Sequence, residues 1–425
     1  MGQSRRSLLA AAAAGLAGCG AAPDGGTVGT TETVTVTPAD GGYAYTTLRA
    51  SGNRLVGGRG RLSDADPVEL PAPEPAWLLA RPTDAGSAWV VVDSEGAASA
   101  FHVRDGGAEP LPVTPERLPA GTPPVLTLED GTPRLVAPEG VSPLSCPAVL
   151  GDGALLFVTS DGRVVRRDPD GARESVAVDA LPDARVVLGG DRAYVLGGAT
   201  GRYGHAVLGD ATEAGRLVVL DTADGLSVAR EASIPAPAVA EGIAPIVARL
   251  TGERVVVTES DRAGGARVVA YSPDGERLAS GEPVGGGFRW RHQLAVAPFG
   301  PGGERELAAV LTPHIGGTAE FYREREGDLE RVATLSGYSS HTIGSRNLDG
   351  GLAGDLDGDG RVELLVPTNA RTELAALRRT EGGVAEAWRL PVGGQLATNV
   401  FGLALAEGGI AVGAGHAGGV RVWGA

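Results

Sequence analysis

Short apolar runs of alternating or β-branched residues recur along most of the chain, and polar, glycine-rich turns separate them. Examples are AWVVVDSEGAASAFHV, ALLFVTSDGRVVRRDPDG and RVVVTESDRAGGARVVAYSPDGERL. A period of two residues is typical of half-buried strands, and turns such as SDG, PDG and ADG supply residues that tolerate the left-handed backbone of tight hairpins. Helical periodicity is almost absent, and 67 glycines with 29 prolines suit helices poorly. The pattern predicts an all-β protein.

The runs group into units of about 40 to 55 residues, each long enough for four strands. Two partial units at the chain ends, 43–75 and 398–425, can complete one further unit together. A β-propeller fits this spacing better than a sandwich, because a closed ring of blades leaves only short edges. We predict seven blades, with eight as the alternative, in a ring closed by N- and C-terminal strands. The complete units are expected at 76–113, 123–179, 184–235, 244–285, 291–337 and 341–392.

The N-terminal segment MGQSRRSLLAAAAAGLAGCG has a short basic head, an apolar run and a small-residue end, which is typical of an export signal. Leu16-Ala17-Gly18-Cys19 resembles the lipobox of prokaryotic lipoproteins, which implies acylation of Cys19 and a membrane anchor. Arg5 and Arg6 resemble a twin-arginine signal, which implies export of a folded chain. We therefore predict a signal peptide over 1–19 and an extracytoplasmic location at the cell membrane.

Residues 20–42 contain small residues, Thr, Pro and a few acidic groups, with nothing bulkier than valine, so we predict a flexible tether there and a propeller domain over 43–425. The formal net charge is −15, which makes nucleic acid an unsuitable partner. With Cys19 lipidated, Cys146 has no partner for a disulfide. We expect a monomer that binds the membrane through its lipid.

The stretch GDLDGDGRVELLV is the strongest chemical signal in the chain. Asp355, Asp357 and Asp359 occupy positions 1, 3 and 5 of a loop, with Arg361 at 7 and Glu363 at 9. Carboxylates packed this closely repel one another unless a cation intervenes, and a hard divalent ion prefers such oxygen ligands. An EF-hand would need a glutamate at position 12 and a following helix, whereas Val366 stands there and a strand-like run follows.

This loop resembles the calcium loop of FG-GAP/VCBS propeller repeats, which joins two strands within one blade. The resemblance implies a structural Ca²⁺ held by the side chains of Asp355, Asp357, Asp359 and Glu363 and by the carbonyl of Arg361. It covers one blade, and Glu363 replaces the usual aspartate. An ion-free acidic turn is the alternative interpretation.

Histidines in three polar stretches form a second candidate site. If RWRHQLAV, LTPHIGG and GYSSHTIGSRNLDG lie on equivalent inner strands, their polar side chains can line the central channel and bind a metal or an anionic ligand. In the alternative interpretation, His292 and His341 bond backbone and His314 lies in a turn. His102, His205 and His416 lack such companions. The candidate channel residues are Arg291, His292, His314, His341, Arg346 and Asn347.

Together these features predict an exported, lipid-anchored, calcium-binding propeller that acts as a binding or scaffold module for a protein or carbohydrate ligand. FG-GAP/VCBS proteins often serve in adhesion, which points the same way. The competing hypothesis is an extracytoplasmic propeller enzyme, a lyase or hydrolase that uses the His/Arg-lined channel face. That enzyme needs a histidine beside a carboxylate, which the spacing does not reveal.

Overall fold

The computed structural model describes residues 42–424. The predicted signal segment with Cys19 and residues 20–41 of the predicted tether lie outside the described residues. Within 42–424, no helix is long and apolar enough to cross a membrane. Apart from one 3-10 helix, η1 (Leu62–Asp64), the regular elements of this range are strands, which confirms the all-β prediction.

Most strands pair with their neighbours in sequence, in antiparallel groups that we call blades. Four blades follow the pattern of four consecutive strands in the first two thirds of the chain. They are β4 (Pro75–Thr83), β5 (Gly86–Asp93), β6 (Ala98–Arg104) and β7 (Gly107–Leu111); β10 (Ala148–Val149), β11 (Leu155–Val158), β12 (Arg163–Arg167) and β13 (Arg173–Ala177); β14 (Val187–Gly189), β15 (Arg192–Thr200), β16 (Glu213–Asp221) and β17 (Ser227–Ser233); and β19 (Ile246–Arg249), β20 (Glu253–Asp261), β21 (Gly265–Tyr271) and β22 (Arg277–Ser280).

Two more blades of the same kind follow. They are β23 (Arg291–Ala297), β24 (Glu306–Leu311), β25 (Thr318–Arg325) and β26 (Asp328–Ser336); and β27 (Leu352–Asp355), β28 (Glu363–Pro367), β29 (Glu373–Thr380) and β30 (Gly383–Pro391). The two-residue strand β18 (Val239–Ala240) pairs with β16 and β20, and β22 pairs with β26, so that three blades share one continuous sheet.

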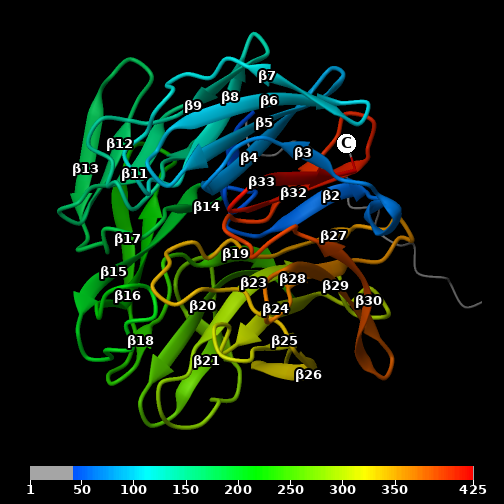
Figure 1. Ribbon diagram of the computed structural model, residues 1–425. Coiled ribbons are helices and arrows are strands. Elements are labelled where there is room, and N and C mark those ends of the chain that lie inside the picture. The colour runs from blue at the N-terminus through cyan, green and yellow to red at the C-terminus, as the bar shows by residue number, and fades with distance from the viewer. Residues whose placement is uncertain (1–41, 425) are drawn as a thin grey trace, which may run out of the picture. The chain divides into compact units, whose positions relative to one another are not determined.

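The last blade joins the two ends of the chain. It contains β31 (Phe401–Ala404), β32 (Ile410–His416) and β33 (Gly419–Trp423), and its fourth strand is β3 (Val68–Leu70), which pairs antiparallel with β33. Figure 1 shows the red C-terminal strands beside the blue N-terminal strand β3. The predicted closure by N- and C-terminal strands, and with it the propeller fold, is confirmed.

The expected single unit at 123–179 is wrong. β8 (Val125–Glu129) and β9 (Thr132–Leu135) form a separate three-stranded sheet with β1 (Ala44–Tyr45), whereas β10 to β13 form their own blade. The sequence pattern missed this division because β1 comes from a distant part of the chain. Counted in this way, residues 42–424 hold eight antiparallel groups, which favours the eight-bladed alternative, although the blade number stays a prediction.

The N-terminal partial unit contributes strands to other sheets as well as to the closing blade. Besides β1 and β3, it supplies β2 (Leu55–Arg59), which runs parallel to β27. Parallel pairing is possible here because the two strands are far apart in sequence and need no hairpin.

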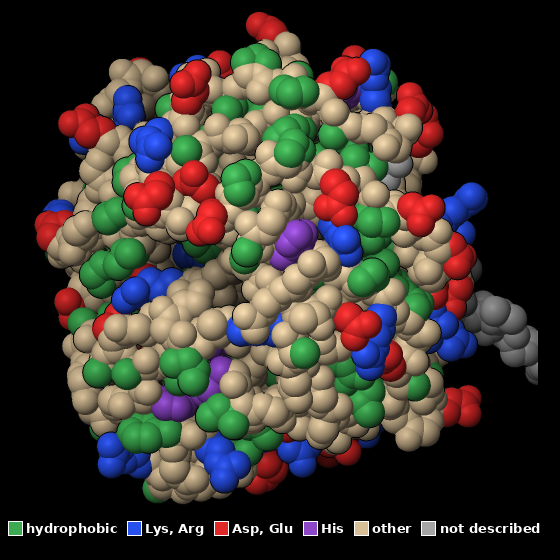
Figure 2. Space-filling view, in the orientation of Figure 1, with side chains coloured by type: hydrophobic (Ala, Val, Ile, Leu, Met, Phe, Trp, Pro, Cys, Tyr) green, Lys and Arg blue, Asp and Glu red, His purple; other side chains and the backbone are tan. Residues whose placement is uncertain are grey.

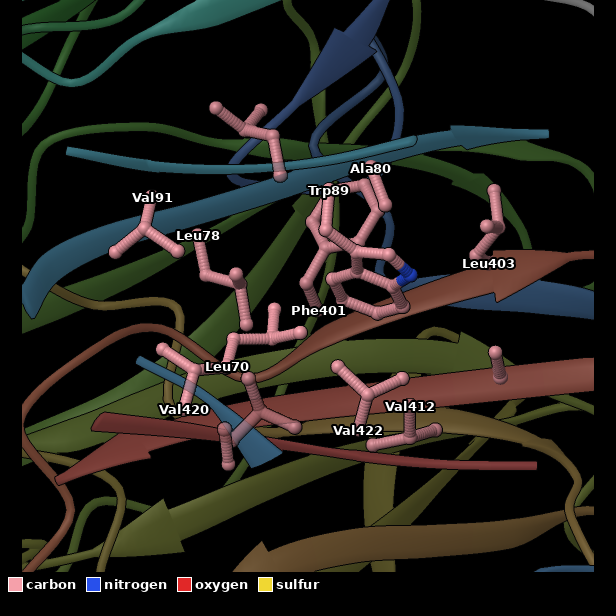
Figure 3. Packing of buried hydrophobic residues seen from close by; sticks show 14 of the residues in the cluster. Leu70, Leu78, Ala80, Trp89, Val91, Phe401, Leu403, Val412, Val420 and Val422 are labelled. Carbon is pink, nitrogen blue, oxygen red and sulfur yellow. The ribbon is translucent and has the colours of Figure 1, made fainter. Parts of the chain in front are cut away.

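Apolar side chains from the closing blade pack against those of β4 and β5 (Figure 3). Trp89 is fully buried, and its ring meets Phe401 edge to face with centroids 6.1 Å apart. Such aromatic pairs add to the stabilisation that burial of their area provides. The closure is therefore held by side-chain packing as well as by the ladder between β3 and β33.

A buried ion triad links segments that are distant in sequence. Asp349 accepts hydrogen bonds from Arg54 at 2.9 Å and from Arg185 at 2.7 Å, and all three side chains are almost fully buried. Burial alone would raise the pKa of Asp349, but Arg185 and Arg54 lower it below its usual value. The Arg54 guanidinium also donates to the carbonyl of Leu294 in β23. Arg54, Arg185 and Asp349 precede β2, β14 and β27, and Leu294 lies in β23. The triad therefore joins these four strands.

The antiparallel order gives each four-stranded blade two different ends. The turns between first and second strands, and between third and fourth strands, lie at one end, which we call the turn end. The connections between second and third strands, and those leading to the next blade, lie at the other, which we call the loop end. The acidic loop after β27 belongs to the turn end, whereas the histidine segments after β24 and β26 belong to the loop end.

Truncation of the buried Trp423 side chain is expected to destabilise the closing blade. Trp423→Ala should lower the free energy of unfolding by about 3–5 kcal/mol, because the ring is fully buried in the closing core. Denaturant unfolding measures this, with Val228→Ala on the exposed face of β17 as a control that changes stability by less than about 0.5 kcal/mol. Deletion of Gly419–Trp423 should abolish cooperative unfolding; a truncated chain that still unfolds cooperatively would contradict closure.

Candidate functional site

The acidic loop connects two paired strands of one blade, as predicted. Asp355 ends β27 and Glu363 begins β28, and these strands are antiparallel neighbours. The amide of Leu356 donates to Glu363 Oε2 at 2.9 Å, and the amide of Gly360 donates to Asp355 Oδ2 at 3.2 Å. Gly360 has a positive φ of 89°, which lets the chain turn back toward Asp355. The loop backbone therefore brings the first and the last carboxylate together.

The oxygen donors of this loop fit a hard cation in part. Ligand atoms of Asp355, Asp357 and Glu363 lie within 4.8 Å of one another. Asp355 Oδ1 is buried and accepts no hydrogen bond, so it has a free lone pair to offer. Asp359 is more exposed, and one of its oxygens accepts the amide of Arg361 at 2.9 Å. The side-chain donors are all carboxylate oxygens, which suits Ca²⁺.

Arg378 also reaches into the loop, although no pattern in the sequence predicts it. Its guanidinium, which projects from β29, contacts Asp357, donates to Glu363 Oε1 at 2.8 Å and lies 3.0 Å from Asp359 Oδ2. One guanidinium thus neutralises part of the charge for which an ion was predicted. Arg378 could be identified only from the pairing of β28 with β29, which places it beside Glu363.

Glu363 is the most buried of the loop carboxylates. Burial raises its pKa to about 7, although the Leu356 amide and Arg378 act in the opposite direction. A buried carboxylate needs a positive partner to remain ionised. Both Arg378 and a bound cation can serve as that partner.

At the loop end, two of the predicted channel histidines come together. The rings of His314 and His341 lie with centroids 5.8 Å apart. His314 follows β24 in a turn, and His341 lies in the connection between β26 and β27. They meet because both segments belong to the loop end, and not because they occupy equivalent inner strands.

The expectation that His205 has no companions is wrong. Its ring centroid lies 6.1 Å from that of His314, although the two residues are more than 100 positions apart. His205 Nδ1 lies 2.5 Å from Oε1 of Glu241, a fully buried carboxylate. His205 lies in the β15–β16 loop and Glu241 in the segment after β18, so spacing along the chain could not reveal this pair.

The indole of Trp290 packs between His292 and His341. The indole stacks on His292 with centroids 5.0 Å apart and meets His341 edge to face, also at 5.0 Å. His292 Nδ1 is bonded to Ser340 Oγ at 2.8 Å. Burial, together with the nearby Arg54, holds the pKa of His292 well below its usual value. His292 is therefore a neutral residue of the core beneath His205, His314 and His341, which we call the histidine group.

The other predicted channel residues point elsewhere. Arg291 is buried against Glu320, at 2.9 Å, and donates to the carbonyls of Ala266 and Glu282. Arg346 forms ion pairs with Asp183 and Asp210. The Asn347 side chain accepts the amide of Asp349. None of these three side chains is directed by a hydrogen bond toward His205, His314 or His341.

Three exposed apolar side chains belong to the same loop segments as the histidines or stack on them. Ile315 follows His314 and is 68% exposed, Ile343 lies two residues after His341 and is 62% exposed, and Phe288 is 40% exposed. Phe288 stacks on His205 with centroids 5.0 Å apart. In Figure 2, histidine side chains reach the surface beside hydrophobic ones. We call Phe288, Ile315 and Ile343 the apolar rim.

A pocket of about 870 Å³ lies at the turn end. Glycine-rich turns after β10, β14 and β19 line it, together with Tyr43, which lies near the start of the described residues. Its charged side chains include Arg49, Arg249 and Glu253. It is thus a mildly polar concavity at the end opposite the histidine group.

Comparison with known proteins identifies no family. No family model matches the chain, and no curated protein matches it. Two of the similar solved structures are BamB from Moraxella catarrhalis, with 14% identity and a TM-score of 0.41 over 87% of this chain and 96% of that one, and a chain in the crystal structure of a mitotic checkpoint complex, with 12% identity and a TM-score of 0.41 over 88% of this chain and 93% of that one.

Proposed function

We propose that this chain is an exported, lipid-anchored β-propeller of the FG-GAP/VCBS type that binds a protein or carbohydrate ligand at the cell surface. The observation that carries the binding role is the apolar rim. Of the five large hydrophobic side chains exposed in residues 42–424, three gather at one end of the blades. Exposed apolar side chains gathered in one place mark interaction sites more often than scattered ones do.

The loops under the rim support a fixed binding surface. Val207, Leu208, Ile243, Trp290 and Leu348 form a small buried core of their own beneath the histidine group. The amide of Gly344 also donates to the carbonyl of Val207 at 2.8 Å, which ties two of these loops together. A surface that is ordered before binding loses less conformational entropy when a partner docks.

A second candidate is an extracytoplasmic lyase or hydrolase that uses this end. The observation that favours it is the contact between His205 and Glu241, since a histidine oriented by a carboxylate can act as a general base. The predicted channel arginines do not contribute to it, because Arg291 and Arg346 are engaged in ion pairs. We therefore favour binding over catalysis.

A photoreactive side chain at Ile315 tests the binding role. In cells, it should crosslink to one defined partner, and Ile343→Glu should remove that crosslink because a charge disrupts the apolar rim. The matched control carries the same group at Val228, which is exposed on β17. Protease or glycosidase digestion then identifies the partner as protein or carbohydrate. Identical crosslinks from both positions would contradict the proposal.

The acidic loop is proposed to bind a structural Ca²⁺ through Asp355, Asp357, Asp359, the carbonyl of Arg361 and Glu363. Chelation should lower the melting temperature of the protein, because the carboxylates then repel one another with only Arg378 and the more distant Arg59 to offset them. Asp357→Ala should abolish this sensitivity. Thermal melts with and without chelator measure both effects, and a melting curve indifferent to chelation would refute the ion.

Substitution of Arg378 distinguishes its contribution to the stability of the loop from that of the proposed ion. Arg378→Ala leaves the buried Glu363 without its guanidinium and should cost roughly 3 kcal/mol in chelator, with most of the loss recovered when Ca²⁺ is added. Arg389→Ala, which removes exposed ion pairs with Glu373 and Glu386, is the control and should change stability by less than about 1 kcal/mol. A loss of stability that Ca²⁺ does not reduce would leave arginine side chains as the only cations of the loop.

The lipid anchor on Cys19 rests on the sequence. Cys19→Ala should release the protein from the membrane fraction, because acylation of this cysteine is the proposed attachment. Immunoblots of separated membrane and soluble fractions measure the release. A variant that stays with the membrane would defeat the lipobox assignment.

A further inference from the structure

We propose that the pocket at the turn end binds an apolar ligand that carries a terminal carboxylate. A polypeptide C-terminus and a small apolar acid both have this chemistry, and different probes distinguish them. The pocket lies at the other end of the blades from the apolar rim. The proposal is therefore independent of the partner proposed for the rim.

The size of the pocket suits a ligand much larger than an ion. Its volume is about 870 Å³, and pockets for drug-sized ligands typically measure about 300–1,000 Å³. The turns after β10, β14 and β19 form its walls, so three blades contribute to it. The residues of the acidic loop, 355–363, are not part of its lining. The pocket is therefore separate from the proposed calcium loop.

Apolar side chains supply part of the wall. Val149, Leu150, Leu188 and Val247 line the pocket and come from all three blades. Leu150 and Leu188 are only half-buried, so apolar surface remains for a ligand to cover. Removal of such surface from water favours a ligand with an apolar body.

Two guanidinium groups line the same pocket. Arg49 donates through Nε to the carbonyl of Leu55 at 2.8 Å, which leaves its two terminal nitrogens for a ligand. Arg249 is exposed. Within residues 42–424, neither arginine forms an ion pair with a carboxylate. A guanidinium can bind a carboxylate through two parallel hydrogen bonds, so these side chains suit an anionic group on the ligand.

Glu253 is the acidic side chain of the lining, and it limits the charge of a suitable ligand. Its carboxylate lies close to Gly189, since a Cβ on that glycine would lie 3.5 Å from Glu253 Oε1 and 2.9 Å from Val247 Cγ1. Two arginines and one glutamate give the lining a net charge of about +1. This charge matches a monocarboxylate better than a phosphate group, which carries about two negative charges.

The inner strands in the wall bind backbone groups from outside their own blades. The amide of Leu188 in β14 donates to the carbonyl of Ala50 at 2.9 Å, and the amide of Val247 in β19 donates to the carbonyl of Ser51 at 2.8 Å. Ala50 and Ser51 line the pocket as well. Strand edges that bond peptide groups are a common means of peptide recognition. They favour a polypeptide C-terminus over a small acid as the ligand.

Fluorescence anisotropy with labelled peptides and the full-length chain tests the site. The probes are Gly-Val-Ala-Leu with a neutral dye at its N-terminus and a free C-terminal carboxylate, the same peptide as its C-terminal amide, and octanoate, whose binding is measured by calorimetry. The free acid should bind at least about 10-fold more tightly than the amide, which cannot form charge-assisted hydrogen bonds to the arginines.

The probes also separate the two sources of the carboxylate. Binding of the free peptide acid without binding of octanoate would support a polypeptide C-terminus. Binding of octanoate without binding of the peptide would support a small apolar acid. Equal affinity for peptide acid and peptide amide, together with no binding of octanoate, would overturn the proposal.

Charge substitutions in the lining should act in opposite directions. Arg249→Ala should weaken binding of the peptide acid by about 10-fold and leave binding of the amide unchanged, because one guanidinium is lost. Its melting curve should match that of the wild type, since the side chain is exposed. Glu253→Gln should strengthen binding of the acid by about twofold to fivefold, because a negative charge is removed.

Arg289→Ala is the matched control for loss of an arginine. Arg289 is exposed in the connection between β22 and β23, at the loop end, and it should not affect binding of either peptide. Wild-type affinity for the peptide acid in Arg249→Ala, or the same loss of affinity in Arg289→Ala, would overturn the proposal.

Discussion

The buried carboxylate of Asp349 is the interaction on which the centre of the protein depends. It is the one negative charge between Arg54 and Arg185, and Arg54 also donates to the backbone carbonyl of Leu294 in another blade. Removal of one member of a buried ion group typically costs about 3–5 kcal/mol, because the remaining charge is left without compensation. Apolar packing, by contrast, connects each blade only to its neighbours. The triad is what connects the N-terminal segment, the middle of the chain and the start of β27 at one place.

The two ends of the blades offer different chemistry because different connections form them. The turn end carries tight hairpins, and its candidate site is made of carboxylates contributed by one loop and of one guanidinium from a neighbouring strand. The loop end carries longer segments that come from several blades, so its candidate site combines residues of distant origin. A partner bound at the apolar rim would leave the acidic loop and the turn-end pocket uncovered.

Features encoded by neighbouring residues could be predicted from the sequence. The alternation of apolar residues located most blades, and the spacing of Asp355, Asp357 and Glu363 located a loop whose donor atoms do converge. Features that depend on distant pairing could not be predicted. β1 joins β8, Arg378 enters the acidic loop from another strand, and His205 reaches His314 from another blade. The sequence pattern suggests inner strands for His314 and His341, whereas the connections between strands bring these histidines together.

The closing pair of strands also has a consequence for the order of events in biosynthesis. β3 is made early, whereas its partner β33 lies more than 300 residues further along the chain. A ribosome-bound chain therefore exposes an unpaired edge until β33 has been made. The edge is only three residues long and carries the charged Glu69, which limits wrong pairing during this wait.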